Sequence, residues 1–517
     1  MSDKHLHKLR DSEIFIGLVG AVGTDLELVS CILEEELRKF NYGSERVVIS
    51  QLISDLPRWH AEVASFADAG DRIEKLMDLG DTIREEVNGG EALAMLSIAN
   101  IQEIRYKLKE KPEVPIQRQA YIIKSCKTVE EVSFFRKVYG KSFLLISVYA
   151  PRSERLDVLA QKIADSKSSD DAEQFKSQAE DLIEKDLKTK GKKFGQDVQN
   201  TFPLGDFFLR MAEKEKMRGN LSRLLELWFG YPFHTPVKDE HAMFLANAAS
   251  LRSSDLSRQV GAVIVNPEGD LLAMGCNDVP KPGGGLPWPG ETQDFRDFQL
   301  GVDPSVTMKE RMINEILEKL KNAGWFNAEI AKKTSTELLE DAIYSDSAVL
   351  DKARISSILE FGRVVHAEMN AITDAAKRGV ELKGSSLYCT TFPCHMCARH
   401  VISSGIREVV FIEPYPKSRT EKLYKHIIKV DGGDHTPHVV NFKPFEGVSP
   451  NRYIDFFSME GKKRKDKHGK IYEWEKSKSF PQVDMISPAY VQIETLVLNQ
   501  INANLYHFGL ESDIKCE

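Results

Sequence analysis

The sequence predicts an α/β protein with two sheet-based domains and a C-terminal extension. Apolar segments of strand length alternate with amphipathic helical segments over residues 1–225, and a second pattern of this kind runs over residues 236–445. Such alternation favours a mainly parallel sheet covered by helices. We therefore expect one domain over each of these ranges. The remaining residues, 446–517, are expected to form an extension that packs on the second domain.

The composition is that of a globular protein of several domains. The chain has 517 residues, a formal net charge of −8 and 42% hydrophobic residues, and this mildly acidic balance implies no general attraction to nucleic acid. Seven cysteines are too few for a disulfide framework and fit a reducing cytoplasm. Acidic residues interrupt the N-terminal stretch that mimics a signal peptide, and no run reaches the roughly 18 apolar residues of a membrane helix. We expect neither export nor membrane association.

The first domain is predicted from short apolar runs and one clear amphipathic helix. Residues 25–40 carry leucine, valine and phenylalanine at helical spacing. The polar stretch 165–200 is expected to be a solvated helix, a loop or a linker. The predicted strands are 14–19, 46–50, 120–124 and 143–150.

The loop GLVGAVGTD, residues 17–25, follows the first strand and opens the first helix, which is the position of a phosphate-binding loop. The P-loop pattern ends in Gly-Lys-Ser/Thr, but here Thr24 and Asp25 follow Gly23 directly. Without the lysine, kinase chemistry is not expected. A plain strand–turn–helix junction and a nucleotide-sensing pocket both stay open. For the second case the candidate nucleotide-binding residues are Gly17, Gly20, Gly23 and Thr24.

The second domain is predicted to begin with a helix and a β-hairpin. Two apolar strands flank the turn Asn-Pro-Glu-Gly within residues 259–277. A long insertion, 280–350, opens with a Gly- and Pro-rich run containing Trp288 and is expected to form a lid or an oligomer contact. Helices are predicted to start near His366 and Cys394, with strands before and after the second one.

The pair Cys394 and Cys397, in FPCHMCARHV, is the first indication of chemistry. A spacing of three residues places both thiols on one side of a helix, and a helix N-terminus favours thiolates. A redox pair would not account for the upstream histidine, and a zinc knuckle would need a second Cys-x-x-Cys pair, which the sequence lacks. A structural zinc with a fourth ligand, His395 or Cys389, stays open.

The sequence HAE, residues 366–368, lies upstream of this pair, and His366 comes 28 residues before Cys394. Catalytic zinc takes three protein ligands and keeps one position for water. His366, Cys394 and Cys397 supply three. Glu368 is then the candidate catalytic acid–base, which takes a proton from water and passes it to the ring nitrogen and the leaving amine.

The combination H-x-E…P-C-x-x-C is the signature of zinc nucleobase deaminases. The longer stretches VVHAEMNAI, LYCTTFPCHMCARHVISSGIREVVF and RQVGAVIV…AMGCND resemble deoxycytidylate deaminases over roughly residues 240–430. The resemblance implies a cytidine-deaminase-like α/β/α domain with a Zn2+ cofactor. It also implies that Asn277 contacts the nucleotide, with a turn-forming asparagine as the alternative.

A phosphorylated substrate needs cations or donors near the mouth of the pocket. Tyr415 and Lys417 follow the strand after the Cys-x-x-Cys helix, and Arg258 lies in the predicted hairpin region. We take these three as candidate substrate-binding residues, although each is also compatible with a simple surface position. Arg252, Lys281 and Arg419 are weaker candidates of the same kind.

The whole layout resembles bacterial anti-phage dCTP/dCMP deaminases, which join a degenerate P-loop kinase-like domain to a deoxycytidylate deaminase domain. Residues 120–155 look like the kinase-like half. The resemblance implies conversion of dCTP and dCMP to deoxyuridine nucleotides, depletion of that pool during infection and inhibition by a small RNA. Deoxycytidylate deaminases also commonly form homo-oligomers.

Two alternatives to a free-nucleotide deaminase stay open. The first is a deaminase of RNA or single-stranded DNA, against which the acidic charge counts, since such enzymes need basic, aromatic grooves. The second is a nucleotide- or RNA-binding regulator with an inactive deaminase half, against which the intact Glu368 counts.

Overall fold

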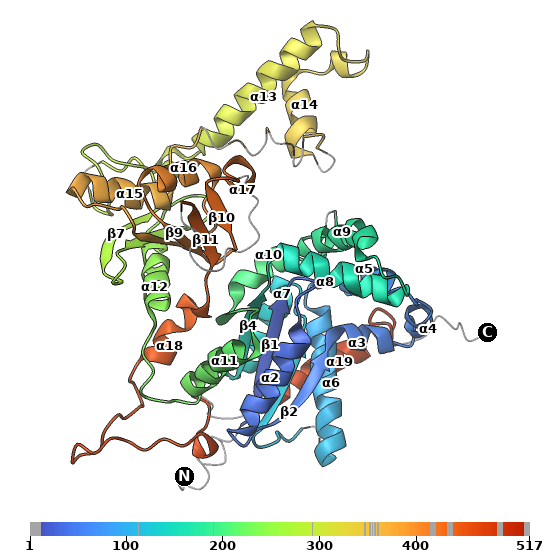
Figure 1. Ribbon diagram of the computed structural model, residues 1–517. Helices are drawn as coiled ribbons and strands as arrows, with labels where there is room; N and C mark the ends of the chain where they lie inside the picture. The colour runs from blue at the N-terminus through green and yellow to red at the C-terminus, as the bar shows by residue number, and fades with distance from the viewer. Residues whose placement is uncertain are drawn as a thin grey trace. The chain divides into compact units, whose positions relative to one another are not determined.

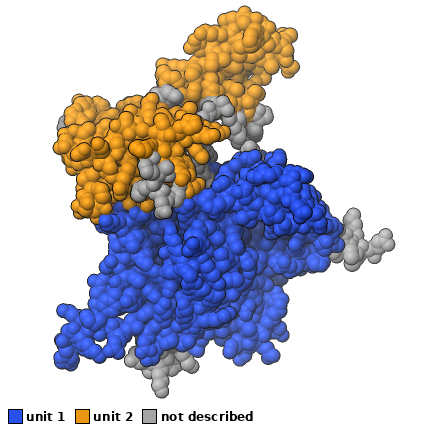
Figure 2. Space-filling model, in the orientation of Figure 1, with its two compact units in different colours: residues 1–244, 412–417, 444–517 blue, residues 245–411, 418–443 orange. Residues whose placement is uncertain are grey.

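The computed structural model describes two compact units (Figures 1 and 2). Unit 1 comprises residues 1–244, 412–417 and 444–517, and unit 2 comprises residues 245–411 and 418–443. Each unit contains one six-stranded sheet, so the predicted α/β class is confirmed. The residues described are 12–111, 113–189, 191–291, 293–345, 348–350, 353, 355, 358, 361–413, 420–431, 438–482 and 490–510.

The sheet of unit 1 has the strand order β12-β5-β4-β1-β3-β2. Strands β1 to β5 pair in parallel, and β12 joins the edge antiparallel to β5. Four of the strands were predicted, and β5 and β12 were missed. The strands are β1 (Ile14–Gly20), β2 (Gly43–Val48), β3 (Gln119–Lys124), β4 (Phe143–Tyr149), β5 (Phe207–Arg210) and β12 (Gly447–Val448).

Helices cover both faces of this sheet (Figure 1). Alternate residues of β1 point to opposite faces: Ile16 joins the apolar core with α2 and α11, whereas Phe15 stacks on Tyr121 and on Tyr139 of α7. The helices are α2 (Leu26–Arg38), α3 (Ile49–Asp55), α4 (His60–Ala64), α5 (Ala69–Val87), α6 (Ala92–Lys109), α7 (Val129–Tyr139), α8 (Arg152–Ser166), α9 (Lys176–Leu187), α10 (Val198–Thr201), α11 (Lys214–Trp228), α18 (Tyr453–Phe457) and α19 (Tyr490–Asn502).

The polar stretch 165–200 contains a packed helix. Leu182 and Ile183 of α9 are buried in a small apolar cluster with side chains of α5 and α8. The stretch is therefore part of unit 1 and not a linker.

The C-terminal segment differs from the prediction that it packs on the deaminase domain, because β12 and α19 lie in unit 1. Glu494 of α19 accepts hydrogen bonds from Arg105 of α6 at 2.9 Å and from Tyr139 at 2.9 Å. Arg105 also donates to Glu13 at 2.8 Å, and Tyr490 donates to the same carboxylate at 2.9 Å. All of these side chains are buried. Buried charges need such complete pairing, so this network attaches α19 to unit 1.

The sheet of unit 2 has the order β10-β11-β9-β8-β6-β7. The predicted hairpin is confirmed: β6 pairs antiparallel with β7, and also with β8, whereas β8 and β9 are parallel. The strands are β6 (Gly261–Val265), β7 (Leu271–Cys276), β8 (Ser386–Cys389), β9 (Glu408–Phe411), β10 (Ile428–Val430) and β11 (Val440–Pro444).

Helix α15 lies against β6 and β7 through small residues. Ala367, Ala371 and Ala375 share the core with β6, and a Cβ atom on Gly275 of β7 would lie 2.5 Å from the backbone nitrogen of Ala371. The helices that begin or lie in unit 2 are α12 (Lys238–Ser250, which starts in unit 1), α13 (Pro304–Asn322), α14 (Ser335–Leu339), α15 (Ala367–Arg378), α16 (His395–Ser403) and α17 (Thr420–Leu423).

The insertion contains α13 and α14, which pack on each other (Figure 1). Ile313 is the buried residue of α13. Throughout the described part of the chain, no helix has the length and apolar content needed to cross a membrane. Shorter elements are the 3-10 turns η1 (Gly140–Ser142), η2 (Ala172–Phe175), η3 (Phe202–Leu204), η4 (Asp297–Leu300), η5 (Ile330–Lys332), η8 (Pro450–Arg452) and η9 (Lys476–Lys478), and the π-helical η6 (Glu340–Tyr344).

Candidate metal centre

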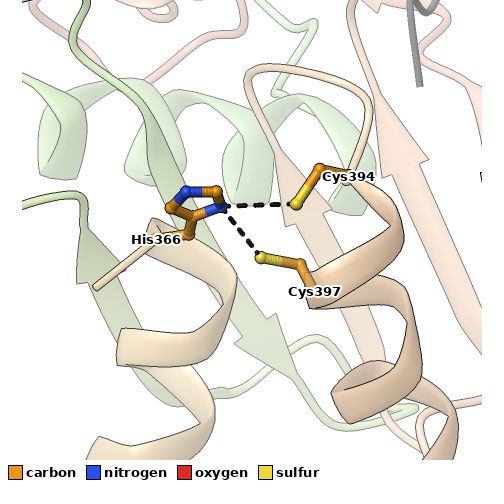
Figure 3. A group of neighbouring side chains, drawn as sticks. All are labelled: His366, Cys394 and Cys397. Carbon is orange, nitrogen blue, oxygen red and sulfur yellow. Dashed lines mark hydrogen bonds between the residues drawn. The ribbon is translucent and has the colours of Figure 1, made fainter. Parts of the chain in front are cut away.

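The three predicted metal ligands lie together in unit 2, where two helices begin (Figure 3). His366 is the N-cap of α15, and Cys394 is the N-cap of α16. Cys397 lies in the first turn of α16 and is buried. Helix α16 starts one residue later than Cys394, so Pro393 precedes the cap instead of opening the helix. The N-terminal end of α16 favours negative charge on both sulfurs.

The geometry fits a tetrahedral zinc ion. His366 Nδ1 lies 3.4 Å from Cys394 Sγ and 3.3 Å from Cys397 Sγ, and the three atoms all lie within 4.8 Å of one another. Zinc–nitrogen and zinc–sulfur bonds of about 2.1 and about 2.3 Å at a tetrahedral angle separate the two donor atoms by about 3.6 Å. The observed separations come close to this value. Soft thiolates and an imidazole are also the donors that zinc prefers.

The two thiols have opposite pKa shifts. The hydrogen bond from Cys397 lowers the pKa of Cys394 to about 3, against the effect of burial, and His366 contributes in the same direction. The hydrogen bond to Cys394 and burial both raise the pKa of Cys397. The hydrogen bond with Cys394 raises the pKa of His366. The protonation states of the two sulfurs are therefore linked, because each shares a hydrogen bond with the other.

Glu368 lies in the first turn of α15, two residues after His366, and is buried. Burial raises the pKa of its carboxyl group, and His366, Cys394 and Cys397 all act on it at short range. Among the described residues, the metal-ligand group consists of His366 and the two cysteines. Glu368 thus adjoins this group without belonging to it.

Asn277, predicted to contact substrate, is buried directly after β7. Its Oδ1 accepts a hydrogen bond from the Val260 backbone at 2.7 Å, and its Nδ2 donates to the carbonyl of Arg258 at 2.9 Å. Both polar groups of the amide therefore hold the segment before β6. The side chain of Arg258 is exposed.

Of the remaining candidate substrate-binding residues, some lie outside the described residues and others already bind groups of the protein. Tyr415 and Lys417 lie outside the described residues, as does Arg419. The Arg252 guanidinium lies 3.6 Å from the ring centre of Trp288 and donates to the Leu286 carbonyl at 3.1 Å. Lys281 pairs with Glu291.

Two positioning residues were not singled out from the sequence. Asn370 donates from its side chain to the Cys276 carbonyl at 3.0 Å, and this bond ties α15 to the end of β7. The buried hydroxyl of Thr420 donates to the Pro393 carbonyl at 3.0 Å, next to Cys394. Asn370 had a signal, since it lies in the motif HAEMNAI on the alanine-rich face of the helix. No sequence signal pointed to Thr420, because its partner Pro393 is 27 positions away.

The N-terminal candidates lie in unit 1. Gly17 is buried in the middle of β1, where a Cβ atom would meet the Phe143 ring at 2.7 Å. This glycine therefore permits close packing. Gly20, Gly23 and Thr24 line a cavity of about 600 Å3.

Comparison with known proteins links unit 2 to nucleotide deaminases. Residues 236–413 match the family model described as the cytidine and deoxycytidylate deaminase zinc-binding region, and this range contains His366, Glu368, Cys394 and Cys397. The deoxycytidylate deaminase of Mus musculus is 25% identical over 224 residues, which cover 43% of this chain and 88% of the mouse protein. That of enterobacteria phage T2 is 39% identical over 77 residues, which cover 14% of this chain and 41% of the phage protein.

The predicted resemblance of this region to deoxycytidylate deaminases is confirmed. A solved structure, the dCMP deaminase of cyanophage S-TIM5 in apo form, shares 18% identity over 41% of this chain and 99% of its own, with a TM-score of 0.20. At that TM-score the structural likeness adds nothing to the sequence match.

Proposed function

We propose that the chain is a zinc-dependent hydrolase that converts deoxycytidine nucleotides, dCMP and dCTP, to deoxyuridine nucleotides. One observation carries this proposal: His366, Cys394 and Cys397 converge at two helix starts with the buried Glu368 beside them. Support comes from the likeness of residues 236–413 to the zinc-binding region of cytidine and deoxycytidylate deaminases.

His366, Cys394 and Cys397 would hold the zinc ion. Zinc bound by three protein ligands supplies a Lewis acid that brings the pKa of water toward about 7. Glu368 takes a proton from water and delivers it to the ring nitrogen and then to the departing amine. Its burial raises its pKa, so the carboxyl group can hold the proton between these transfers. The products are the deoxyuridine nucleotide and ammonia.

The substrate contacts belong to the same proposal. Asn277 holds the backbone from Arg258 to Val260 through two hydrogen bonds, and we assign it the role of positioning this segment against the nucleotide. Arg258, Tyr415 and Lys417 would bind the phosphate, because guanidinium, hydroxyl and ammonium groups are its usual donors.

We also propose the wider role implied by the layout. In this scheme residues 1–225 form a degenerate, P-loop kinase-like regulatory domain, and residues 236–445, with the insertion 280–350, form the deaminase domain of a homo-oligomer. Depletion of the deoxycytidine nucleotide pool would serve anti-phage defence, under restraint by a small RNA. The resemblance of residues 120–155 to a kinase-like half supports this scheme.

Product analysis on the purified, zinc-loaded chain tests the activity. The chain is incubated with dCMP, dCTP, CMP, CTP and cytosine-containing oligonucleotides, and ammonia and uracil products are measured. Turnover of the free deoxynucleotides is the expected result. Turnover of oligonucleotides alone would point to a polynucleotide deaminase, and no turnover at all would point to a binding protein.

A further inference from the structure

Unit 1 contains a cavity of about 600 Å3 that the proposed deamination does not use. It lies at the carboxyl ends of β1 and β3, between Gly20 and Lys127, and helices α3, α5 and α8 contribute to its walls. Strand β1 has β3 on one side and β4 on the other, so the strand order reverses there. Ligands of open α/β sheets bind at this edge and at this reversal. The volume is typical of small-molecule sites.

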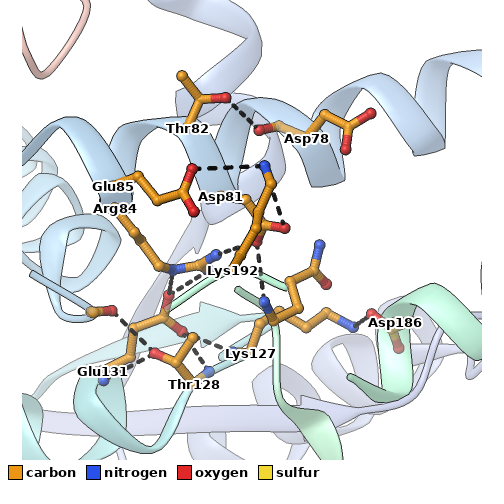
Figure 4. A network of polar contacts seen from close by, with 12 residues as sticks. Asp78, Asp81, Thr82, Arg84, Glu85, Lys127, Thr128, Glu131, Asp186 and Lys192 are labelled. Carbon is orange, nitrogen blue, oxygen red and sulfur yellow. Dashed lines mark hydrogen bonds and ion pairs between the residues drawn. The ribbon is translucent and has the colours of Figure 1, made fainter. Parts of the chain in front are cut away.

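The loop after β1 is not open to a triphosphate. The Val22 backbone amide donates to the carboxylate of Asp186 at 2.7 Å, and Lys127 pairs with the same carboxylate at 2.8 Å (Figure 4). The Thr24 amide donates within the turn to Ala21 at 3.0 Å. In a P-loop, such amides cradle phosphates with the help of a lysine. Here two of these amides are already used: the Val22 amide binds the Asp186 carboxylate, and the Thr24 amide binds the Ala21 carbonyl. The lysine of the P-loop pattern is absent.

Two cations remain for an anionic ligand. Arg84 is neutralised by Asp81 and Glu131 (Figure 4). Arg72 of α5 and Lys162 of α8 line the cavity and are exposed. Neither forms an ion pair with another described side chain. A phosphate monoester, with nearly two negative charges at neutral pH, matches this pair.

The other residues that line the cavity fit a ligand whose remaining part is largely apolar and carries a few hydrogen-bond donors. Aliphatic side chains of α3, α5 and α6 line the cavity, among them Ile53, Ile73 and Leu93. Apart from Asp186, whose carboxylate pairs with Lys127, two lining residues carry a buried oxygen with no hydrogen-bond partner in the described structure, Thr24 Oγ1 and Gln196 Oε1. Buried polar atoms are rarely left unpaired, and a rotation of either side chain toward the cavity would let its oxygen accept a hydrogen bond from a ligand.

We propose that this cavity binds a nucleoside monophosphate and transfers no phosphoryl group. The base lies between the aliphatic side chains, its amino or imino groups and the ribose hydroxyls donate to Thr24 and Gln196, and the phosphate lies near Arg72 and Lys162. This site is independent of the metal centre, so its test does not depend on deamination.

Calorimetric titration of the zinc-loaded full chain tests the ligand class. The probes are AMP, GMP and dTMP, which carry no cytosine, compared with adenosine, ribose 5-phosphate, inorganic phosphate and ATP. We expect at least one monophosphate to bind about tenfold more tightly than each of these comparison compounds. The proposal is wrong if no monophosphate binds up to about 1 mM, or if adenosine, ribose 5-phosphate, phosphate or ATP binds as tightly.

Variants of exposed residues locate the site without threatening the fold. Arg72→Gln combined with Lys162→Gln should weaken monophosphate binding by about tenfold or more, and Val158→Glu, which adds a negative charge to the exposed lining, should act in the same direction. The matched control is Lys137→Gln combined with Lys216→Gln, which removes the same charge from exposed positions outside the lining. Equal affinity of the cavity variants and the control would overturn the assignment. Circular dichroism verifies that each variant is folded.

Discussion

At the scale of single residues, the proposed chemistry depends on Glu368, whose carboxyl group adjoins the ligand group without belonging to it. Replacing Glu368 with Gln keeps the size of the side chain and removes its proton transfer. We expect turnover to fall by about 10²–10⁴-fold, while zinc stays bound at one ion per chain. The measurements are the rate of ammonia release and the zinc content by atomic emission.

His400→Ala is the matched control, since His400 is on α16 outside the ligand group and its loss should leave both readings unchanged. A Glu368→Gln variant with full activity, or one that loses its zinc, would contradict the role assigned to this carboxyl group.

Glu226, in α11, gives a pH-dependent prediction. Burial raises the pKa of its carboxyl group, but hydrogen bonds from His234 and Lys476 outweigh burial and bring the pKa to about 2, below the usual 4.5. A pKa lowered on folding contributes stability above the unfolded value and loses it as the pH falls through the folded value. The stability difference between the wild type and Glu226→Gln should therefore be full above pH 4.5 and shrink toward pH 2.

Urea unfolding midpoints at a series of pH values measure that difference. Glu103→Gln serves for comparison, because the Glu103–Lys107 pair is exposed and such pairs contribute about 0–1 kcal/mol. If the gap between the wild type and Glu226→Gln stays constant as the pH falls, Glu226 has no lowered pKa in the folded chain.

Residue-level prediction from sequence worked where donors lie close along the chain. The spacing of Cys394 and Cys397 predicts that they share one side of a helix, and His366 was found through its motif. Asn277 was predicted as a substrate contact, but the sequence does not contain the information that both ends of its amide bind backbone. These two hydrogen bonds form only because the chain brings the end of β7 next to the segment before β6.

At the scale of elements, the metal site depends on how closely α15 approaches β7. Gly275 permits this approach, since an added Cβ atom would lie 2.5 Å from the Ala371 nitrogen and 2.6 Å from the Ala367 carbonyl oxygen. Both are backbone atoms, so α15 must move as a whole in a Gly275→Ala variant. We expect a loss of about 1–3 kcal/mol in unfolding free energy and zinc binding about tenfold weaker, because His366 moves with the helix. Denaturant unfolding and competition with a zinc-binding dye measure the two effects.

Gly219→Ala in α11 is the control for this substitution. Apart from its chain neighbours and the backbone of its own helix, no heavy atom lies within 4 Å of the added Cβ position, and alanine in a helix should raise stability by about 0.4–1 kcal/mol. Unchanged zinc affinity in Gly275→Ala would show that the position of α15 does not control the metal site.

Helices and strands could be predicted from sequence where the run of apolar residues was long enough to show a periodicity. The runs that became β1, β3 and β4 are longer and mostly apolar, and they were found within a residue or two. β5 has four residues, FFLR, which is too short to show a periodicity. The C-terminal residues 446–517, which contain α19, were assigned to the wrong domain, because the attachment of α19 depends on Glu494 reaching Arg105, 389 positions away. No local pattern contains that pairing.

At the scale of the whole molecule, each unit has an apolar core of its own. The core of unit 1 surrounds β1 and β4, and the core of unit 2 surrounds β6 and β8. Because the metal centre lies in unit 2 and the proposed nucleoside monophosphate site lies in unit 1, we expect two thermal unfolding transitions with different ligand dependence. Removing zinc with a chelator should lower only one of them, and a monophosphate should raise only the other.

Differential scanning calorimetry of the full chain measures both transitions. A ligand present at 100 times its dissociation constant stabilises the unit that binds it by about 2.7 kcal/mol, which is enough to separate the two responses. Glu368→Gln, which keeps the ligand group intact, should leave the chelator response unchanged, whereas Arg72→Gln combined with Lys162→Gln should abolish the response to the monophosphate alone. A single transition that both compounds move would mean that the two cores unfold as one cooperative unit. The prediction that the two units unfold independently would then be wrong.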